Sequence, residues 1–114
     1  MQRDREFFLD ILEAAKLAVS YVGEKSKEDF LKDPQCQDAV IRRLEIIGEA
    51  SRRISAETQA DFPDLPWGEM IGMRNVMIHK YDDVDPGIVW KTVKSNLPKL
   101  ITSFKTILEA PDKE

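Results

Sequence analysis

Helical periodicity runs through every apolar segment of this sequence. Residues Asp4 to Val22 place eight apolar side chains on one broad helical face, and Gly23 follows as a stop signal. No stretch of useful length shows the alternation of apolar and polar residues that a half-buried strand requires. The pattern therefore predicts an all-α protein, an antiparallel bundle of about four long helices plus short ones.

Cap signals predict where the next two helices begin. Ser26 with an acidic residue three positions later predicts a short helix to about Leu31. The pair Asp33-Pro34 predicts a long helix to about Ile54, with aspartate as the cap and proline at the first helical position. The inner face of this long helix is predicted to carry Val40, Leu44, Ile47, Ser51 and Ile54.

The second half of the chain predicts two more long helices. Residues 56–66 contain two prolines and predict a rigid connector, which leads into a helix from Trp67 to Tyr81. The pair Asp85-Pro86 starts the last helix, which keeps one apolar phase to about Glu109. Because that phase survives Pro98, a kink is expected there rather than a break.

Length and composition limit the kind of protein further. The 114 residues suit a single domain, residues 1–114, with residues 110–114 as a frayed tail. No apolar run approaches the roughly 20 residues that span a bilayer, so no membrane association is expected. The single cysteine, Cys36, fits a reducing cytoplasm, and one cysteine with one histidine cannot build a zinc cluster. We therefore expect a cytoplasmic protein with no bound metal and no cofactor.

The net charge bears on binding to nucleic acids. The chain carries 17 basic and 21 acidic residues, a formal net charge of −4. Non-specific binding to nucleic acids is mostly neutralisation of phosphates by basic residues. The charge therefore argues against a generic nucleic-acid-binding tail, and no DNA partner is expected. An RNA enzyme with a local basic patch and weak substrate binding remains compatible with it.

The segment Trp67 to Tyr81 has two features that an ordinary core helix lacks. At about 100° per residue, Arg74 falls in the middle of the apolar stripe, where a guanidinium is costly to bury without a partner. The neighbouring face carries Gly68, Gly72, Asn75 and His79. Glycines inside a helix cost about 1 kcal/mol each relative to alanine, so they suggest close approach by another helix or a ligand.

Charged residues on the predicted helix ending at Ile54 allow two interpretations. Their spacings of three and four residues suit intrahelical ion pairs on a solvated face. Alternatively, some of the arginines contact phosphates, or Glu49 is the partner of Arg74. The residues concerned are Arg42, Glu45, Glu49, Arg52 and Arg53.

Other candidate groups point to structural roles. Cys36 would need the only histidine beside it in space to act as a nucleophile. Trp67 and Trp90 suit core anchors better than platforms for base stacking. The methionines at positions 70, 73 and 77 suit core filler better than a promiscuous binding surface.

Arg74 and His79 together suit phosphodiester chemistry. Taken alone, a single histidine near a helix end is more often structural. With an arginine, imidazole can move a proton near neutral pH while the guanidinium stabilises the charge that builds on the phosphate. A separation of five residues places the two about 140° apart on a regular helix. Either the helix loosens near His79 or a second copy supplies the other group, and a groove at Gly68 and Gly72 would permit that copy to approach.

The sequence resembles a known family over about residues 40–108. The octapeptide from Arg74 to Tyr81, RNVMIHKY, has the form R-x-x-x-x-H-x-Y and looks like the motif of the HepT-type toxins in the HEPN superfamily of small helical RNases. Similar surroundings accompany the motif in order. They are Leu44-Glu-Ile-Ile-Gly-Glu-Ala50, Pro66-Trp67, Gly72-Met-Arg-Asn75, Ile88-Val-Trp90 and Leu97-Pro98.

The resemblance implies a HEPN-like fold and a specific function. It implies a metal-independent endoribonuclease that acts as a homodimer, with Arg74 and His79 as the catalytic pair and Asn75 as an auxiliary residue. The 2′-hydroxyl of the RNA would attack the adjacent phosphate and leave a 2′,3′-cyclic phosphate. The resemblance also implies a type VII-like toxin–antitoxin system, in which an MntA-type nucleotidyltransferase antitoxin transfers AMP to Tyr81.

A non-enzymatic function is the alternative. In that case the chain is a helical module that binds a nucleotidyltransferase or nucleotides, and the motif is an interaction surface. RNA cleavage by the purified protein would separate the two hypotheses.

Overall fold

The computed structural model describes residues 4–79 and 85–110, with the backbone alone for residues 75–79. All regular elements of these residues are helices, so the prediction of an all-α fold is confirmed. The elements are α1 (Arg5–Val22), α2 (Lys27–Leu31), α3 (Pro34–Arg53), α4 (Ala56–Asp61), α5 (Trp67–His79), α6 (Pro86–Lys91), the π-helical segment η3 (Thr92–Asn96) and α7 (Leu97–Glu109). The last four residues of the predicted tail and the end of the predicted Trp67–Tyr81 helix lie outside the described residues.

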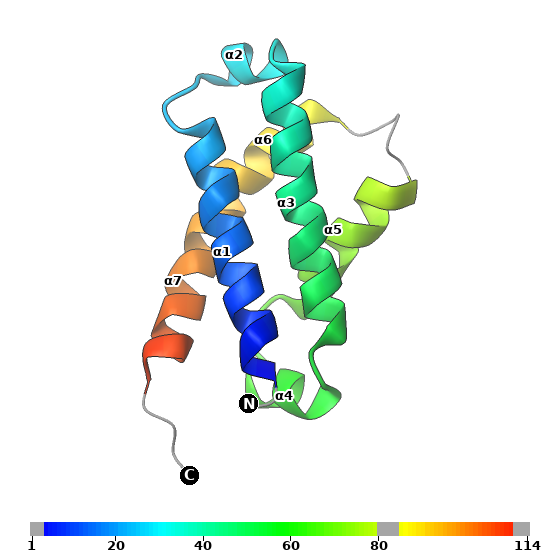
Figure 1. Ribbon diagram of the computed structural model, residues 1–114, viewed down its shortest axis with the longest axis vertical. Coiled ribbons are helices and arrows are strands. Elements are labelled where there is room, and N and C mark those ends of the chain that lie inside the picture. Colours follow the sequence, from blue (N-terminus) through cyan, green and yellow to red (C-terminus); the bar gives the residue numbers. More distant parts are fainter. Residues whose placement is uncertain (1–3, 80–84, 111–114) are drawn as a thin grey trace.

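The long helices form an antiparallel bundle. In Figure 1, α1 runs up the molecule, α3 runs down beside it, α5 runs up again, and α6, η3 and α7 run down together. Helix α1 packs between α3 and α7, and α5 packs against α3. This arrangement confirms the predicted bundle of about four long helices.

The cap signals begin the helices where the sequence predicts. The Ser26 hydroxyl accepts a hydrogen bond from the backbone N–H of Asp29 at 3.1 Å, at the start of α2. The Asp33 carboxylate accepts one from the N–H of Cys36 at 3.0 Å, at the start of α3. Such side chains satisfy N–H groups that have no partner in the first turn of a helix.

The predicted apolar faces meet in one core. The fully buried side chains of α1 include Phe8, Ile11 and Ala18, and all five predicted inner residues of α3 are buried. Part of the core is an aromatic cluster centred on Phe8. Its ring packs against those of Phe62, Trp67 and Phe104, with centroids 5.2–6.1 Å apart. The cluster ties α1 to the start of α5.

The connector between α3 and α5 contains a short helix that the sequence analysis missed. Helix α4 is capped by Ser55, whose hydroxyl accepts a hydrogen bond from the N–H of Thr58 at 3.2 Å. Asp4 binds the same cap, since its carboxylate accepts hydrogen bonds from the hydroxyls of Ser55 at 2.8 Å and Thr58 at 2.6 Å. The sequence signal for this helix is Ser55 followed by Glu57 in the first turn. Because α4 occupies residues 56–61, the connector consists of residues 62–66 alone.

The last helix is continuous, but its irregularity differs from the predicted kink. A π-helical turn, η3, precedes Pro98, and the N–H of Leu97 donates to the carbonyl of Thr92 five residues back. Proline has no N–H to donate, and its ring clashes with the carbonyl four residues earlier in an α-helix. Widening the turn before Pro98 relieves that clash and keeps Val93 and Leu97 in the core.

Candidate active site

The first turns of α5 are anchored firmly on the core. The indole Nε1–H of Trp67 donates a hydrogen bond to the carbonyl of Phe62 at 2.9 Å, and Met70 is fully buried. Met73 also packs against the core, whereas Ile71 is half-buried and does not belong to it. The face of α5 that packs on the core therefore carries Trp67, Met70 and Met73. The roles predicted for Trp67 and Met70 are confirmed.

Helices α3 and α5 touch at Gly48. A Cβ atom placed on Gly48 would lie 2.3 Å from the backbone nitrogen of Arg74 and 2.5 Å from its Cβ. These distances are well inside van der Waals contact, so only glycine fits between the two helices here. The glycine that permits close packing inside this chain is therefore Gly48, which the sequence analysis did not single out.

The two glycines of α5 face open space. Apart from the chain neighbours and the nearby backbone of α5 itself, no atom of the described residues lies within 4 Å of a Cβ built on Gly68 or on Gly72. Within residues 4–79 and 85–110, neither glycine is therefore in close contact with another helix. Their predicted role in close approach by a second copy stays a prediction.

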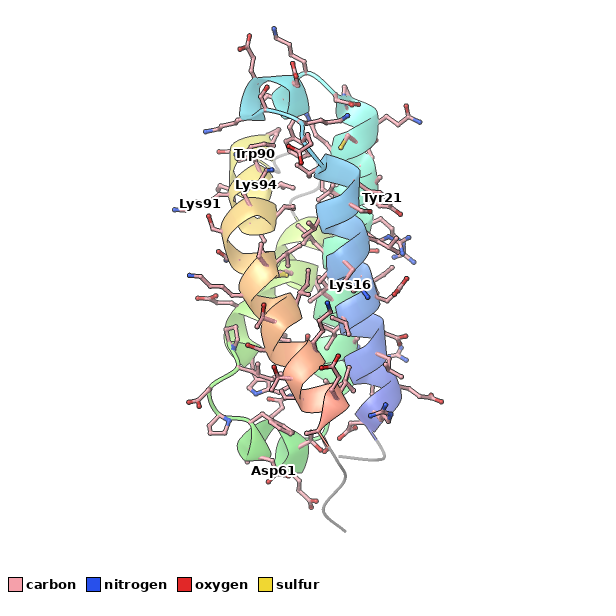
Figure 2. The ribbon with its side chains drawn as sticks, turned by 90° about the vertical axis from the view of Figure 1, so that its left-hand side faces the viewer. Lys16, Tyr21, Asp61, Trp90, Lys91 and Lys94 are labelled. Carbon is pink, nitrogen blue, oxygen red and sulfur yellow. The ribbon has the colours of Figure 1, made fainter. Side chains whose placement is uncertain are left out.

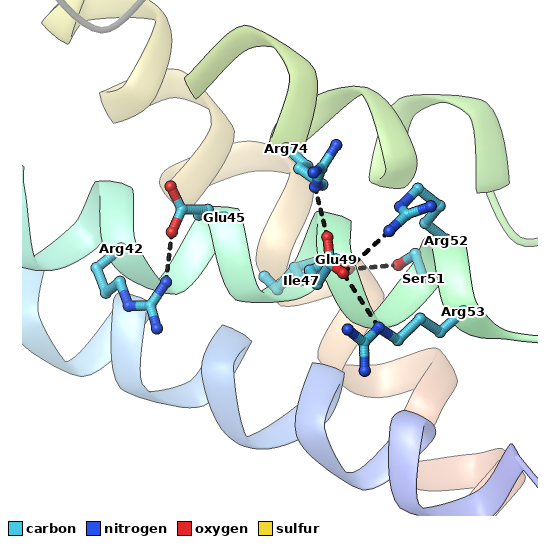
Figure 3. Close-up of polar contacts among 8 residues, drawn as sticks. All are labelled: Arg42, Glu45, Ile47, Glu49, Ser51, Arg52, Arg53 and Arg74. Atoms are coloured by element: carbon cyan, nitrogen blue, oxygen red, sulfur yellow. Dashed lines mark hydrogen bonds and ion pairs between the residues drawn. The ribbon is translucent and has the colours of Figure 1, made fainter. Parts of the chain in front are cut away.

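Arg74 has the partner that one interpretation of the sequence gave it. Its Nε forms an ion pair with Oε2 of Glu49 on α3 (Figure 3). The other carboxylate oxygen, Oε1, lies 3.1 Å from Nη2 of Arg52 and 3.1 Å from Nε of Arg53. Glu49 thus pairs with three arginines, so the predicted intrahelical ion pairs and the predicted pair with Arg74 occur together. Contacts of the α3 arginines with phosphates stay a prediction.

The arginines hold Glu49 in its charged form. The hydrogen bond from Arg52 is the main cause that lowers the pKa of Glu49, and that from Arg53 adds to it. The positive charges of Arg52 and Arg74 act in the same direction, and together these effects outweigh the partial desolvation of the carboxylate. The ion pairs are therefore intact at neutral pH.

A groove of about 410 Å³ lies beside this cluster. Helices α1, α3 and α5 supply its walls, which consist of Phe7, Asp10, Arg42, Glu45, Ile46, Glu49, Ala50, Arg53 and Arg74. The Arg74 side chain is 30% exposed, so a ligand in the groove can reach it. Because acidic and basic residues line the groove in equal number, its charge is balanced, in keeping with the predicted weak binding of a polyanion.

The remaining residues of the motif are placed in part. The backbones of Asn75 and His79 belong to α5, and their side chains are not among those described. Tyr81 lies outside the described residues. The structure thus brings Arg74 together with Glu49, and the pairing of Arg74 with His79 stays a prediction.

Cys36 has the surroundings of a structural thiol. It is buried, and its Sγ donates a hydrogen bond to the carbonyl of Tyr21 at 3.5 Å. Burial, together with the nearby charge of Asp33, raises the pKa of Cys36. Because the thiolate is the nucleophilic form, a raised pKa argues against a catalytic role.

Trp90 is a core residue at the other end of the bundle. It packs on Phe30 with ring centroids 5.7 Å apart, and Lys94 Nζ lies 5.0 Å from its ring centroid (Figure 2). One face of the indole is therefore covered by a cation–π contact. The prediction that Trp90 is a core anchor is confirmed.

Neither a metal cluster nor a membrane span occurs in the described ranges, 4–79 and 85–110. No three His, Cys, Asp or Glu side chains there lie close enough together to hold a metal ion. No helix within the same ranges is long and apolar enough to cross a membrane.

Comparison with known proteins decides the family. The model of the HepT-like ribonuclease family matches residues 11–107 of the chain. The chain belongs to the HepT-like ribonuclease family. This membership confirms the resemblance found in the motif, and with it the prediction of a ribonuclease.

Relatives of nearly the same length support this assignment. A "Probable ribonuclease HepT" of Thermococcus cleftensis is 44% identical over 108 residues, which cover 94% of this chain and 98% of the relative. A "Putative RNase" of Methanocaldococcus jannaschii is 44% identical over 100 residues, 87% of this chain and 92% of the relative. Another "Putative RNase", of Caldanaerobacter subterraneus subsp. tengcongensis, is 37% identical over 109 residues, 96% of this chain and 97% of the relative. No solved structure gave a significant match.

Proposed function

We propose that this HepT-like ribonuclease is a metal-independent endoribonuclease in which Arg74 and His79 form the catalytic pair. The 2′-oxygen of the RNA attacks the adjacent phosphorus, and the bond from phosphorus to the 5′-oxygen breaks. His79 acts either as the base that accepts the proton of the 2′-hydroxyl or as the acid that donates a proton to the 5′-oxygen. Arg74 stabilises the negative charge on the phosphate. The products are a 2′,3′-cyclic phosphate and a 5′-hydroxyl.

The observation that carries this proposal is the position of Arg74. Helix α5 packs on the core, yet the guanidinium of Arg74 lies at the edge of an open groove. An ion pair with Glu49 on the neighbouring helix holds it there. A purely structural arginine would not need an accessible groove beside it. The family of the chain supplies the matching chemistry.

We further propose that the enzyme acts as a homodimer, with the two motifs meeting at the interface. The backbone of α5 is α-helical through His79, which favours a second copy over a loosened helix as the means of joining the two groups. Gly72 lines a groove of about 320 Å³ with Leu44, Met73 and the exposed Ile88, among other residues. An apolar groove that contains a glycine with free space around it suits close approach by another helix.

The cellular role that fits this enzyme is that of a toxin in a cytoplasmic, type VII-like toxin–antitoxin system. An MntA-type nucleotidyltransferase antitoxin would transfer AMP to Tyr81, and the added phosphates would repel RNA from the motif next to it. Co-expression with such a partner is expected to add about 329 Da per AMP to the intact mass. The added mass should be absent from Tyr81→Phe, and its persistence in that variant would exclude Tyr81 as the acceptor.

RNA cleavage by variants of the motif tests the central proposal. Arg74→Ala and His79→Ala should each lose cleavage by about 100-fold or more, because each removes a group needed in the transition state. Lys91→Ala, on the exposed face of α6, is the control and should cleave like the wild type. Motif variants that cleave RNA and inhibit growth as well as the wild type would contradict the proposal.

A further inference from the structure

We propose that Glu49 is a positioning residue for Arg74, which it orients for the phosphate of the substrate. The inference rests on the proposed function, in which Arg74 contacts that phosphate. It adds a residue from α3, outside the motif on α5, to the machinery of the reaction. Three observations on Glu49 and its neighbours carry it.

The first observation is that the two oxygens of the Glu49 carboxylate bind different partners. Oε1 is held by Arg52 and Arg53, which lie three and four residues further along α3, while Oε2 pairs with Arg74 on α5 (Figure 3). The two intrahelical pairs restrict the rotamers of Glu49 before Arg74 is considered. The oxygen that faces α5 is therefore fixed in place.

The second observation is the contact at Gly48, directly before Glu49. With no side chain between the helices, the backbone of Arg74 lies against α3 at this point. The distance from the Glu49 backbone to the Arg74 backbone is thus set by packing of the two helices. A carboxylate and a guanidinium that start from fixed backbones have few alternative arrangements.

The third observation is which nitrogen of Arg74 is used. The ion pair involves Nε, and in the part of the chain that the structure describes Arg74 pairs with no carboxylate other than that of Glu49. A guanidinium has five N–H donors, so four remain on the terminal nitrogens. Those four form the edge that can bind a phosphate through two parallel hydrogen bonds.

Together these features hold Arg74 ready for the substrate. A free arginine side chain samples many rotamers, and ordering it on binding costs conformational entropy. Because the pair with Glu49 forms when the protein folds, much of the conformational entropy of Arg74 is lost before the substrate binds. The pair also limits where the terminal nitrogens can point. A role of this kind acts on the transition state, so it should appear in kcat more than in KM.

The groove contains a matched control for this role. Glu45 lies one turn before Glu49 on α3, lines the same groove and forms an ion pair with Arg42 of its own helix. Unlike Glu49, it forms no ion pair with α5 within the described residues. Neutralising Glu45 changes the charge of the groove by the same amount as neutralising Glu49, without releasing Arg74.

The test is a double-mutant cycle on the full-length protein, with steady-state cleavage of a fluorescent RNA oligonucleotide as the measurement. Glu49→Gln should lower kcat by about 10- to 100-fold. Glu45→Gln should keep the wild-type kcat, because the loss of its charge from the groove acts on RNA binding and therefore on KM. In the Arg74→Ala background, Glu49→Gln should lower the residual kcat no further, because its effect passes through Arg74. Circular dichroism confirms that each variant is folded.

Three results would overturn the positioning role. They are an unchanged kcat in Glu49→Gln, an equal loss in Glu45→Gln, and a further loss when Glu49→Gln is added to Arg74→Ala. If Glu49→Gln does not fold, Arg52→Ala tests the positioning role instead, because it removes one of the two ion pairs that hold Oε1 of Glu49. It should lower kcat at least about threefold in the wild type and have no effect beside Arg74→Ala. A kcat equal to that of the wild type would overturn the role.

The wild type and Arg74→Ala separate this inference from the proposed function. A wild-type chain that does not cleave RNA, or an Arg74→Ala variant that cleaves normally, refutes the proposed function and the positioning role with it. If the wild type cleaves and Arg74→Ala does not, the Glu49 variants judge the positioning role alone.

Discussion

Arg74 shows how much of a single residue's environment the sequence can predict. Its place on an apolar stripe marked it as a residue that needs a partner, and Glu49 was one of the partners considered. The structure confirms that pair. Gly48 was not singled out, although it lies beside Glu49, because periodicity tells which face of a helix is buried and says nothing about how closely the next helix approaches. Only the packed structure shows that a single methyl group would collide there.

Adding that methyl group is a direct test of the contact. Gly48→Ala would normally stabilise a helix interior by about 0.5–1 kcal/mol. Here the new Cβ would lie 2.3 Å from the Arg74 nitrogen, and moving the backbone of α5 should cost more than the helix gains. We expect a net loss of about 1–3 kcal/mol in the free energy of unfolding, measured with urea.

The matching control is Asp38→Ala on the exposed face of α3. Alanine also raises helix propensity there, so this variant should be unchanged or slightly more stable. A Gly48→Ala protein as stable as the control would mean that α3 and α5 do not touch at this point.

At the scale of elements, the sequence predicted most helices and missed their local adjustments. The start signals at Ser26 and Asp33 were sufficient because a capping side chain acts within one turn of the chain. Helix α4 is hard to predict because the two prolines after it favour an irregular connector, while its only start signal is the cap at Ser55. The π-helical turn before Pro98 could not be foreseen, because the apolar pattern persists whether the helix kinks or widens.

The bond between the start of α1 and α4 makes a prediction about pH. Burial pushes the pKa of Asp4 upward, but the hydrogen bonds from Thr58 and Ser55 outweigh it, so the pKa lies below its usual value. A carboxyl whose pKa is lowered by folding stabilises the protein fully above its unfolded pKa of about 3.9. That stabilisation is lost as the pH falls through the lower pKa of the folded state.

Asp4→Asn should therefore be less stable than the wild type by about 1.5–3 kcal/mol at neutral pH. The difference should stay constant down to about pH 5 and shrink below about pH 4. Urea unfolding at a series of pH values measures it, and Asp61→Asn, at the exposed end of α4, is the control (Figure 2). A difference that does not change with pH would show that the charge of Asp4 contributes nothing.

At the scale of the whole molecule, the sequence and the comparisons agree on the family, and the proposed site needs a second copy of the chain. Helical periodicity was sufficient for the bundle, because the long helices each bury one apolar face. In the proposed dimer, by contrast, the relation between Arg74 and His79 depends on the surface at which two copies meet. No pattern within one chain reports which surfaces associate, so the homodimer rests on the resemblance and on the open space at Gly68 and Gly72.

Mixed dimers test whether the site is shared between two copies. One chain would carry Arg74→Ala and the other His79→Ala, with different affinity tags, so that sequential purification isolates the heterodimer. If each site takes Arg74 from one copy and His79 from the other, one site has both residues intact and the other has neither. The heterodimer should then show about half of the wild-type kcat, although each variant alone is inactive.

The same experiment distinguishes the alternative arrangements. If Arg74 and His79 of one chain act together, both sites of the heterodimer lack a residue, and no cleavage returns. A wild-type pair that carries the same two tags sets the full activity, and a tagged pair of Arg74→Ala chains sets the background. Recovery of cleavage would require the two α5 helices to face each other across the interface, because a residue on one copy can complete the site only within contact distance of the other.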